Sequence, residues 1–259
     1  MRPPSLRGSG SAGSPGGEDD GPFAASRIAG CTLGSTLKSA VACGQLLGRL
    51  LCRSDPEVPR TIYLARHGET DWNAAGRWQG QSDVPLNARG RQQALGLGAA
   101  LRALRDGRVT AIVSSDLSRA QETATIAGGV LGLALAYVDA GLRERTFGVF
   151  EGLTREDCER LHPEAWQAWV ALQKPPPGGE ARHELAARVT AAIARASELA
   201  ADPAAAVLVV SHGGAMRAAV GVALGTTPGP VENGALWRIA WDGGIAAADP
   251  VEARPVSIR

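Results

Sequence analysis

Short apolar runs recur between residues 60 and 241, and their lengths suit β-strands better than helices. The clearest is 205–211, AAVLVVS, which has no charged residue and predicts a strand buried on both faces. Further strands are predicted at 61–65, 109–115 and 135–139, with 235–241 as the last strand.

Amphipathic stretches with apolar residues at helical spacing lie between these runs. They predict helices over 88–106, 118–131, 155–172, 184–202 and 214–224. Asn87 is suited to cap the first of these helices, a break is expected near Pro163, and 174–180 is expected to form a loop. This alternation predicts an α/β fold: a three-layer sandwich with a mostly parallel central sheet flanked by helices.

Residues 1–58 have a different composition from the rest of the chain. The stretch RPPSLRGSGSAGSPGGEDDGP is rich in glycine, serine and proline and has little apolar surface to bury. We therefore predict a low-complexity, disordered N-terminal extension over 1–58 and one folded domain over 59–259, and we assign the extension no function.

Composition excludes few functions, but it bears on the expected partners and on the cellular location. The net charge of +1 on 259 residues gives no argument for a nucleic-acid or membrane partner, and no apolar run reaches the length of a membrane span. The four cysteines form no CxxC pair, which favours a reducing, cytoplasmic location. Lys38 and Lys174 are the only lysines, so a single arginine is weak evidence of function in this chain.

The candidate chemistry lies where three predicted strands end. Arg66-His67-Gly68 follows the strand at 61–65, Arg119 follows the strand at 109–115, and His212-Gly213-Gly214 follows the strand at 205–211. In parallel α/β sheets, ligands bind beyond the carboxyl ends of the strands, beside helix N-termini that favour anions. Two histidines, two arginines and glycines that admit close backbone approach predict a phosphoryl pocket.

Each of these residues also has a simpler interpretation. A histidine after a strand is more often structural than catalytic, and a lone arginine is more often a surface residue. The two histidines could instead ligate a metal, but no acidic or histidine partner has zinc or iron spacing, and neighbouring arginines would repel a cation. We therefore expect neither a metal nor a cofactor. His162 and His183 lie in polar helical contexts and are expected to be solvated.

Four motifs in the region 60–259 resemble the histidine phosphatase superfamily, also called phosphoglycerate-mutase-like: RHGETDWN, LSRAQET, ERTFGVFEG and VSHGG. The resemblance implies the fold of that family and a phosphohistidine formed on His67. It implies a phosphate pocket from Arg66, Arg119 and a protonated His212, with Glu144 as the general acid. Residues implied to contact phosphate or substrate are Arg66, Thr70, Asn73, Gln79, Gly80, Arg119 and Gly213.

Departures from the mutase pattern favour the phosphatase branch. The segment 153–210 is compact, Lys174 is its only lysine, and Phe147 stands where a mutase-type motif would carry a tyrosine. We expect a metal-independent phosphomonoester hydrolase acting on a small phosphorylated metabolite. The alternatives are a 2,3-bisphosphoglycerate-dependent phosphoglycerate mutase and a non-catalytic protein that binds a phosphorylated partner.

The substrate stays open among sugar phosphates, phosphorylated nucleosides and ribazole phosphate, and a homodimer stays open as the oligomeric state. The region 142–182 should set specificity. Its aromatic residues, Phe147, Phe150, Trp166 and Trp169, either line an apolar wall or pack the helices onto the sheet.

Overall fold

The computed structural model describes residues 58–104, 108–200, 202 and 204–251. The chain divides into two units, Met1–Ser54 and Asp55–Arg259, and every described element belongs to the second. The extension predicted over 1–58 lies outside the described residues, except for Val58.

A six-stranded mixed sheet forms the centre of the domain, with strand order β3-β2-β4-β1-β5-β6. The first four strands in that order pair in parallel, whereas β5 pairs antiparallel with β1, and β6 with β5. The strands are β1 (Arg60–Arg66), β2 (Arg108–Ser114), β3 (Tyr137–Val138), β4 (Ala205–Ser211), β5 (Leu236–Trp241) and β6 (Ile245–Val251).

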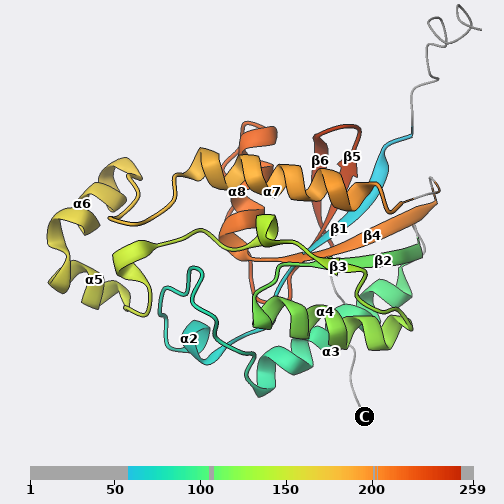
Figure 1. Ribbon diagram of the computed structural model, residues 1–259, viewed down its shortest axis with the longest axis horizontal. Helices are drawn as coiled ribbons and strands as arrows, with labels where there is room; N and C mark the ends of the chain where they lie inside the picture. Colours follow the sequence, from blue (N-terminus) through green and yellow to red (C-terminus); the bar gives the residue numbers. More distant parts are fainter. Residues whose placement is uncertain (1–57, 105–107, 201, 203, 252–259) are drawn as a thin grey trace, which may run out of the picture. The chain divides into compact units, whose positions relative to one another are not determined.

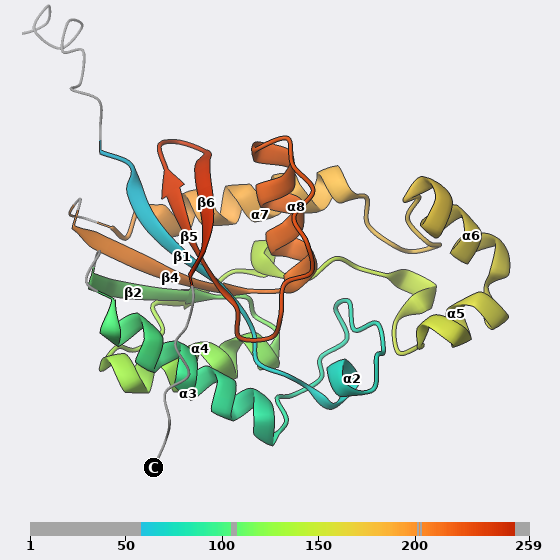
Figure 2. The same ribbon diagram turned by 180° about the vertical axis from the view of Figure 1, so that it is seen from behind.

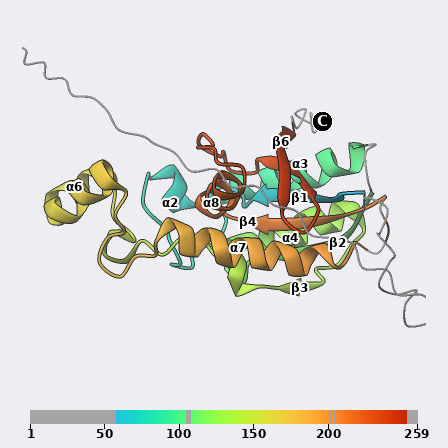
Figure 3. The ribbon, with the colours of Figure 1, turned by 90° about the horizontal axis from the view of Figure 1, so that it is seen from above.

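Helices cover both faces of the sheet, so the predicted three-layer sandwich is confirmed (Figures 1 and 2). On one face lie α3 (Ala88–Ala103) and α4 (Ser118–Leu131), and on the other lie α7 (Arg182–Ser197) and α8 (Gly213–Ala223). Side chains alternate along β1: Ile62 and Leu64 enter the core with α7 and α8, and Tyr63 and Ala65 enter the core with α3 and α4. Seen from above, α7 runs along the sheet (Figure 3).

The structure contains the predicted helices and strands, but several of them begin or end at other residues than predicted. Asn87 caps α3 as expected, its side chain accepting a 2.8 Å hydrogen bond from the Gly90 N–H, but α3 ends at Ala103. The prediction that 235–241 is the last strand is wrong, because β6 follows it. This edge strand is largely exposed and carries Asp249 and Pro250, so it lacks the apolar pattern of a strand; proline is tolerated there because an edge strand leaves N–H positions unpaired.

Three helices lie beyond the carboxyl ends of the parallel strands: α2 (Asp71–Ala74), α5 (Arg155–Leu161) and α6 (Pro163–Leu172). Pro163 starts α6, in agreement with the predicted break. The aromatic residues of this region pack mainly on one another. Phe147, Phe150 and Trp166 form a small core with Cys158, and Trp169 and Trp78 pack against it. Of the two alternatives left open for these residues, packing of the helices onto the sheet is not what the structure shows, because their contacts form a cluster separate from the two cores beside the sheet.

No helix in the described part of the chain is long and apolar enough to cross a membrane.

Candidate active site

The sheet brings the two histidines together. β4 lies between β1 and β2, and Arg66 is the register partner of Ser211, so His67 and His212 leave neighbouring strands at the same edge. The His67 N–H donates to the Ser211 carbonyl at 3.0 Å. The two ring centroids are 5.0 Å apart with the rings tilted by 59°, and both side chains are buried.

The ring of His67 is held by the backbone of the next residue. Nδ1 lies 2.6 Å from the Gly68 carbonyl, which can only accept, so Nδ1 carries the proton and Nε2 keeps its lone pair. Gly68 is required there, because a Cβ would lie 2.3 Å from the Gly90 carbonyl oxygen. Burial, and then the guanidiniums of Arg119 and Arg66, hold the pKa of His67 well below its usual value. The ring is therefore neutral and suited to act as a nucleophile.

His212 is buried and favours the neutral form, whereas the protonated form implied by the resemblance belongs to the site with a phosphoryl group bound. Its Nε2 hydrogen-bonds with the Ser115 hydroxyl at 2.9 Å, while Nδ1 is buried without a partner. Burial, followed by Arg119 and His67, holds the pKa of His212 well below its usual value. Burial penalises the charged imidazole and the neighbouring positive charges add to that penalty, so a bound anion would favour protonation.

Two arginines flank the histidines, Arg119 fully buried and Arg66 partly buried. Arg119 is fully buried and donates at 2.8 Å to the carbonyls of both Gly80 and Ser82. Arg66 donates to the Val231 carbonyl at 2.6 Å. Burial lowers the pKa of Arg66, and it lowers the pKa of Arg119 to about 10, so both stay charged at neutral pH. The Nε of each is buried without a partner, which leaves donor capacity for an anion.

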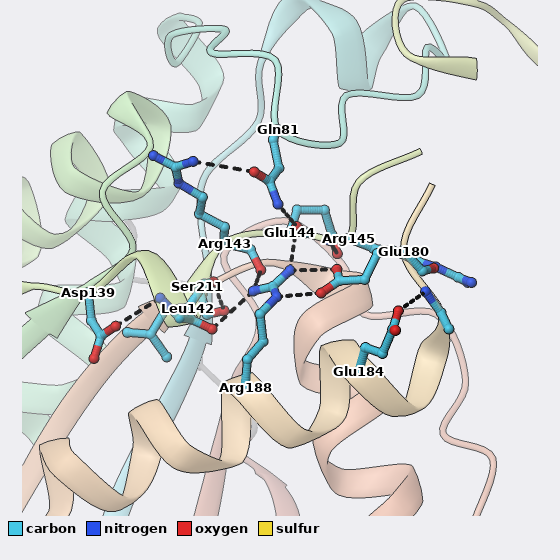
Figure 4. A network of polar contacts seen from close by, with 12 residues as sticks. Gln81, Asp139, Leu142, Arg143, Glu144, Arg145, Glu180, Glu184, Arg188 and Ser211 are labelled. Carbon is cyan, nitrogen blue, oxygen red and sulfur yellow. Dashed lines mark hydrogen bonds and ion pairs between the residues drawn. The ribbon is translucent and has the colours of Figure 1, made fainter. Parts of the chain in front are cut away.

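The carboxylate of Glu144 lies against the N-terminus of α8. It accepts hydrogen bonds from the Gly214 N–H at 2.8 Å and from the Arg145 N–H at 2.7 Å. A Cβ on Gly214 would lie 2.3 Å from Glu144 Oε1, so the approach depends on glycine. The backbone around Glu144 is held by Arg188 from α7, which bonds to three carbonyls of this segment (Figure 4).

These groups surround a cavity of about 360 Å³. Of the residues predicted from the motifs, those lining it are Arg66, His67, Asn73, Gln79, Gly80, Arg119, Glu144 and Gly213. His212 lies behind, in ring contact with His67. Thr70 is not part of the lining. It caps α2, its hydroxyl accepting from the Asn73 N–H at 3.1 Å, and it helps to hold the Asn73 side chain.

The motifs did not identify several residues of the cavity and its support, among them Arg77, Trp78, Ser115, Arg217 and Asn233. Arg217 had a usable signal, because it stands four residues after Gly213 and so on the same face of the predicted helix. Asn233 had none: its amide reaches the carbonyls of His67 and Gly68 from a distant loop.

An α/β sandwich with paired histidines and arginines at the strand ends defines the class of protein. The chain belongs to the histidine phosphatase superfamily (branch 1), whose model matches residues 62–246. The resemblance and the fold expected from the sequence are thereby confirmed.

Individual relatives differ in the activity for which they are named. A Salmonella choleraesuis protein named "Probable phosphoglycerate mutase GpmB" is 41% identical over 172 residues, covering 63% of this chain and 74% of that protein. A mycobacterial glucosyl-3-phosphoglycerate phosphatase solved with VO3 is 32% identical with a TM-score of 0.61, covering 71% of this chain and 98% of that one. An Escherichia coli K-12 "putative alpha-ribazole-5'-P phosphatase" is 28% identical with a TM-score of 0.64, covering 78% and 100%.

Proposed function

We propose that the protein is a metal-independent phosphomonoester hydrolase that forms a phosphohistidine on His67 and acts on small phosphorylated metabolites. One arrangement carries the proposal: a neutral, buried imidazole with Nε2 available, flanked by the guanidiniums of Arg66 and Arg119 and by a second imidazole. A cavity of about 360 Å³ suits a small metabolite, since ligand pockets commonly have about 300–1,000 Å³. The phosphatase named among the similar structures, solved with VO3, adds support.

In the first step, Nε2 of His67 attacks phosphorus, the N–P bond forms and the P–O bond to the leaving group breaks. Arg66 and Arg119 donate to the phosphoryl oxygens as charge spreads over them, and this positioning and charge stabilisation is the main source of rate in phosphoryl transfer. His212 gains a proton with the bound dianion, so that its unpaired Nδ1 becomes a further donor. Glu144, in its protonated form, delivers its proton to the departing alkoxide.

In the second step, water attacks the phosphohistidine. Glu144 now accepts the proton from that water, the N–P bond breaks, and orthophosphate leaves with His67 restored. Both steps use groups that line the cavity or contact it. Splitting one displacement into two through a covalent intermediate is the established advantage of nucleophilic catalysis.

The second candidate is a 2,3-bisphosphoglycerate-dependent phosphoglycerate mutase, favoured by the name of the Salmonella relative. Phe147 lines the cavity and offers no hydroxyl to a sugar acid, which favours the hydrolase. The third, a binding protein without turnover, is disfavoured because the candidate nucleophile and acid both border the cavity.

The test is orthophosphate release from a panel of phosphomonoesters in the presence of EDTA, alongside an assay of 2-phosphoglycerate and 3-phosphoglycerate interconversion with 2,3-bisphosphoglycerate. The proposal predicts release by the wild type, none by His67→Ala, and full release by the control His183→Asn, whose side chain is exposed. Interconversion faster than release would identify a mutase. Neither reaction would indicate a binding protein.

A further inference from the structure

The cavity holds more positive charge than a phosphoryl group needs. Arg66, Arg77, Arg119 and Arg217 line it, against the single carboxylate of Glu144. With neutral histidines, the lining carries a net charge of three, and a phosphoryl dianion leaves a surplus. Arg66 and Arg119 lie at the phosphate site, so the surplus belongs to Arg77 and Arg217.

These two arginines are held in place but not neutralised. Arg217 donates through Nε to the Pro228 carbonyl at 3.0 Å, and Arg77 donates through one terminal nitrogen to the Gly152 carbonyl at 2.6 Å. Within the described ranges, neither has a carboxylate at ion-pair distance, whereas six other arginines do. A guanidinium has five N–H donors, so one that donates to a single carbonyl still has donors that can bind an anion.

The fold sets the spacing between the two charged regions. A Cβ on Gly213 would lie 3.2 Å from the Arg66 side chain, so Gly213 is the residue of α8 that lies beside the proposed phosphate site. Arg217 follows one helical turn later on the same face, which is about 5–6 Å between Cβ positions. A spacing of this size lets one small substrate place its phosphoryl group at Arg66 and a second anionic group at Arg217.

We propose, on the basis of the proposed function, that Arg217 and Arg77 form a second anion subsite, and that the preferred substrate is a compact phosphomonoester with a further carboxylate or phosphate. The test compares kcat/KM for two matched probes, 3-phosphoglycerate and glycerol 3-phosphate, which differ in the carboxylate. A third probe, 1,3-propanediol bisphosphate, distinguishes a second phosphate from a carboxylate.

We expect the wild type to prefer a doubly anionic probe over glycerol 3-phosphate. In Arg217→Gln that preference should shrink by about 10-fold to 100-fold, the value of a charge-assisted hydrogen bond. The control Arg238→Gln, an exposed change on β5, should keep it. No preference in the wild type, or equal losses on all probes in Arg217→Gln, would overturn the subsite. If no probe is hydrolysed, or if His67→Ala keeps hydrolysis, the proposed function itself fails.

A separate observation concerns Arg188, which ties the segment carrying Glu144 to α7 (Figure 4). Its guanidinium forms a two-point ion pair with Glu180 at 2.6 and 2.7 Å. The same group donates to the carbonyls of Gly141, Arg143 and Glu144 at 3.0, 2.7 and 2.8 Å. All five donor hydrogens of the guanidinium can thus be engaged. Arg188 itself does not line the cavity, and it reaches the lining only through the backbone of Glu144.

From this second observation we infer that Arg188 is a positioning residue for the general acid. Its loss would free the backbone of Glu144, and displacement of a catalytic group by about 1 Å can cost about 100-fold in rate. The defect should depend on the leaving group. An alkoxide needs the proton from Glu144, whereas 4-nitrophenolate departs without help.

The experiment measures kcat/KM for glycerol 3-phosphate and 4-nitrophenyl phosphate, because kcat/KM reports on transfer to His67. Arg188→Ala should lose about 10-fold to 100-fold more on the alkyl ester than on the aryl ester, and Arg188→Lys should recover part of this difference. Arg195→Ala on the same helix, which breaks the two-point contact with Asp139, is the matched control and should change neither value. The inference is contradicted if Arg188→Ala loses equally on both esters while Glu144→Gln loses more on the alkyl ester. Arg188 would then have a purely structural role.

Discussion

Acidification should destabilise the folded domain through its two buried histidines. In the folded state, burial and the neighbouring arginines keep the pKa values of His67 and His212 well below the usual one. In the unfolded chain both titrate near the ordinary value of about 6.5. Below that pH the unfolded state binds protons that the folded state does not. Stability is therefore complete above about pH 6.5 and declines as the pH falls towards the folded pKa values.

The size of the effect follows from linkage. Each histidine contributes little above pH 6.5, and its slope approaches about 1.4 kcal/mol per pH unit only below the unfolded pKa. With both folded pKa values below this range, the two together therefore contribute about 2.7 kcal/mol between pH 7.5 and 5.5. For a domain of this size, 1 kcal/mol corresponds to about 2–4 °C, which gives a fall in Tm of about 5–11 °C. A loss of that size is a large share of a typical folding free energy of about 5–15 kcal/mol.

Urea unfolding at a series of pH values, followed by tryptophan fluorescence, measures this slope. His67→Asn and His212→Asn should each remove about half of it. His183→Asn should leave it unchanged, because that side chain is exposed. Unfolding free energies that stay constant from pH 7.5 to 5.5, or a wild-type slope in the double variant, would refute the electrostatic description of the site.

Three further changes test separate parts of the molecule. Glu144→Gln should lower kcat/KM for alkyl phosphates by about 10²–10⁴-fold with little effect on Tm, as measured by orthophosphate release; a wild-type rate would exclude Glu144 as the acid. Gly68→Ala should reduce both activity and Tm, because the new Cβ would meet the Gly90 carbonyl, whereas Gly96→Ala, which meets nothing within 4 Å, should be stable and active. Phe150→Ala should cost about 3–5 kcal/mol of unfolding free energy in urea titrations, since this ring is fully buried among Phe147, Trp166 and Trp169; a loss below 1 kcal/mol would contradict that packing.

Sequence reasoning succeeds where local pattern and structure coincide. The apolar run 205–211 is β4, residue for residue, and is buried throughout. The Asn87 cap is likewise a local signal that the structure retains. β6 escaped prediction because Asp249 and Pro250 interrupt its pattern, which an exposed edge strand tolerates.

The residues of the candidate site also differ in whether a local sequence pattern could predict their placement. His67 and His212 follow predicted strands, so parallel pairing was enough to expect them at one edge. The placement of Glu144 depends instead on tertiary contacts, with the N-terminus of α8 and with Arg188, that no periodicity encodes. The separate aromatic core was not among the alternatives considered, for a related reason: residue type indicates that a side chain is buried, but it does not indicate which side chains bury it.

The most direct test of the account is to trap the covalent intermediate. Wild-type protein mixed with a ³²P-labelled phosphomonoester, quenched in alkali within the turnover time and mapped by mass spectrometry, should carry label on one residue, His67. Glu144→Gln, slow to hydrolyse the intermediate, should accumulate more of it. Turnover without protein-bound label, or label on a residue other than His67, would contradict the central claim.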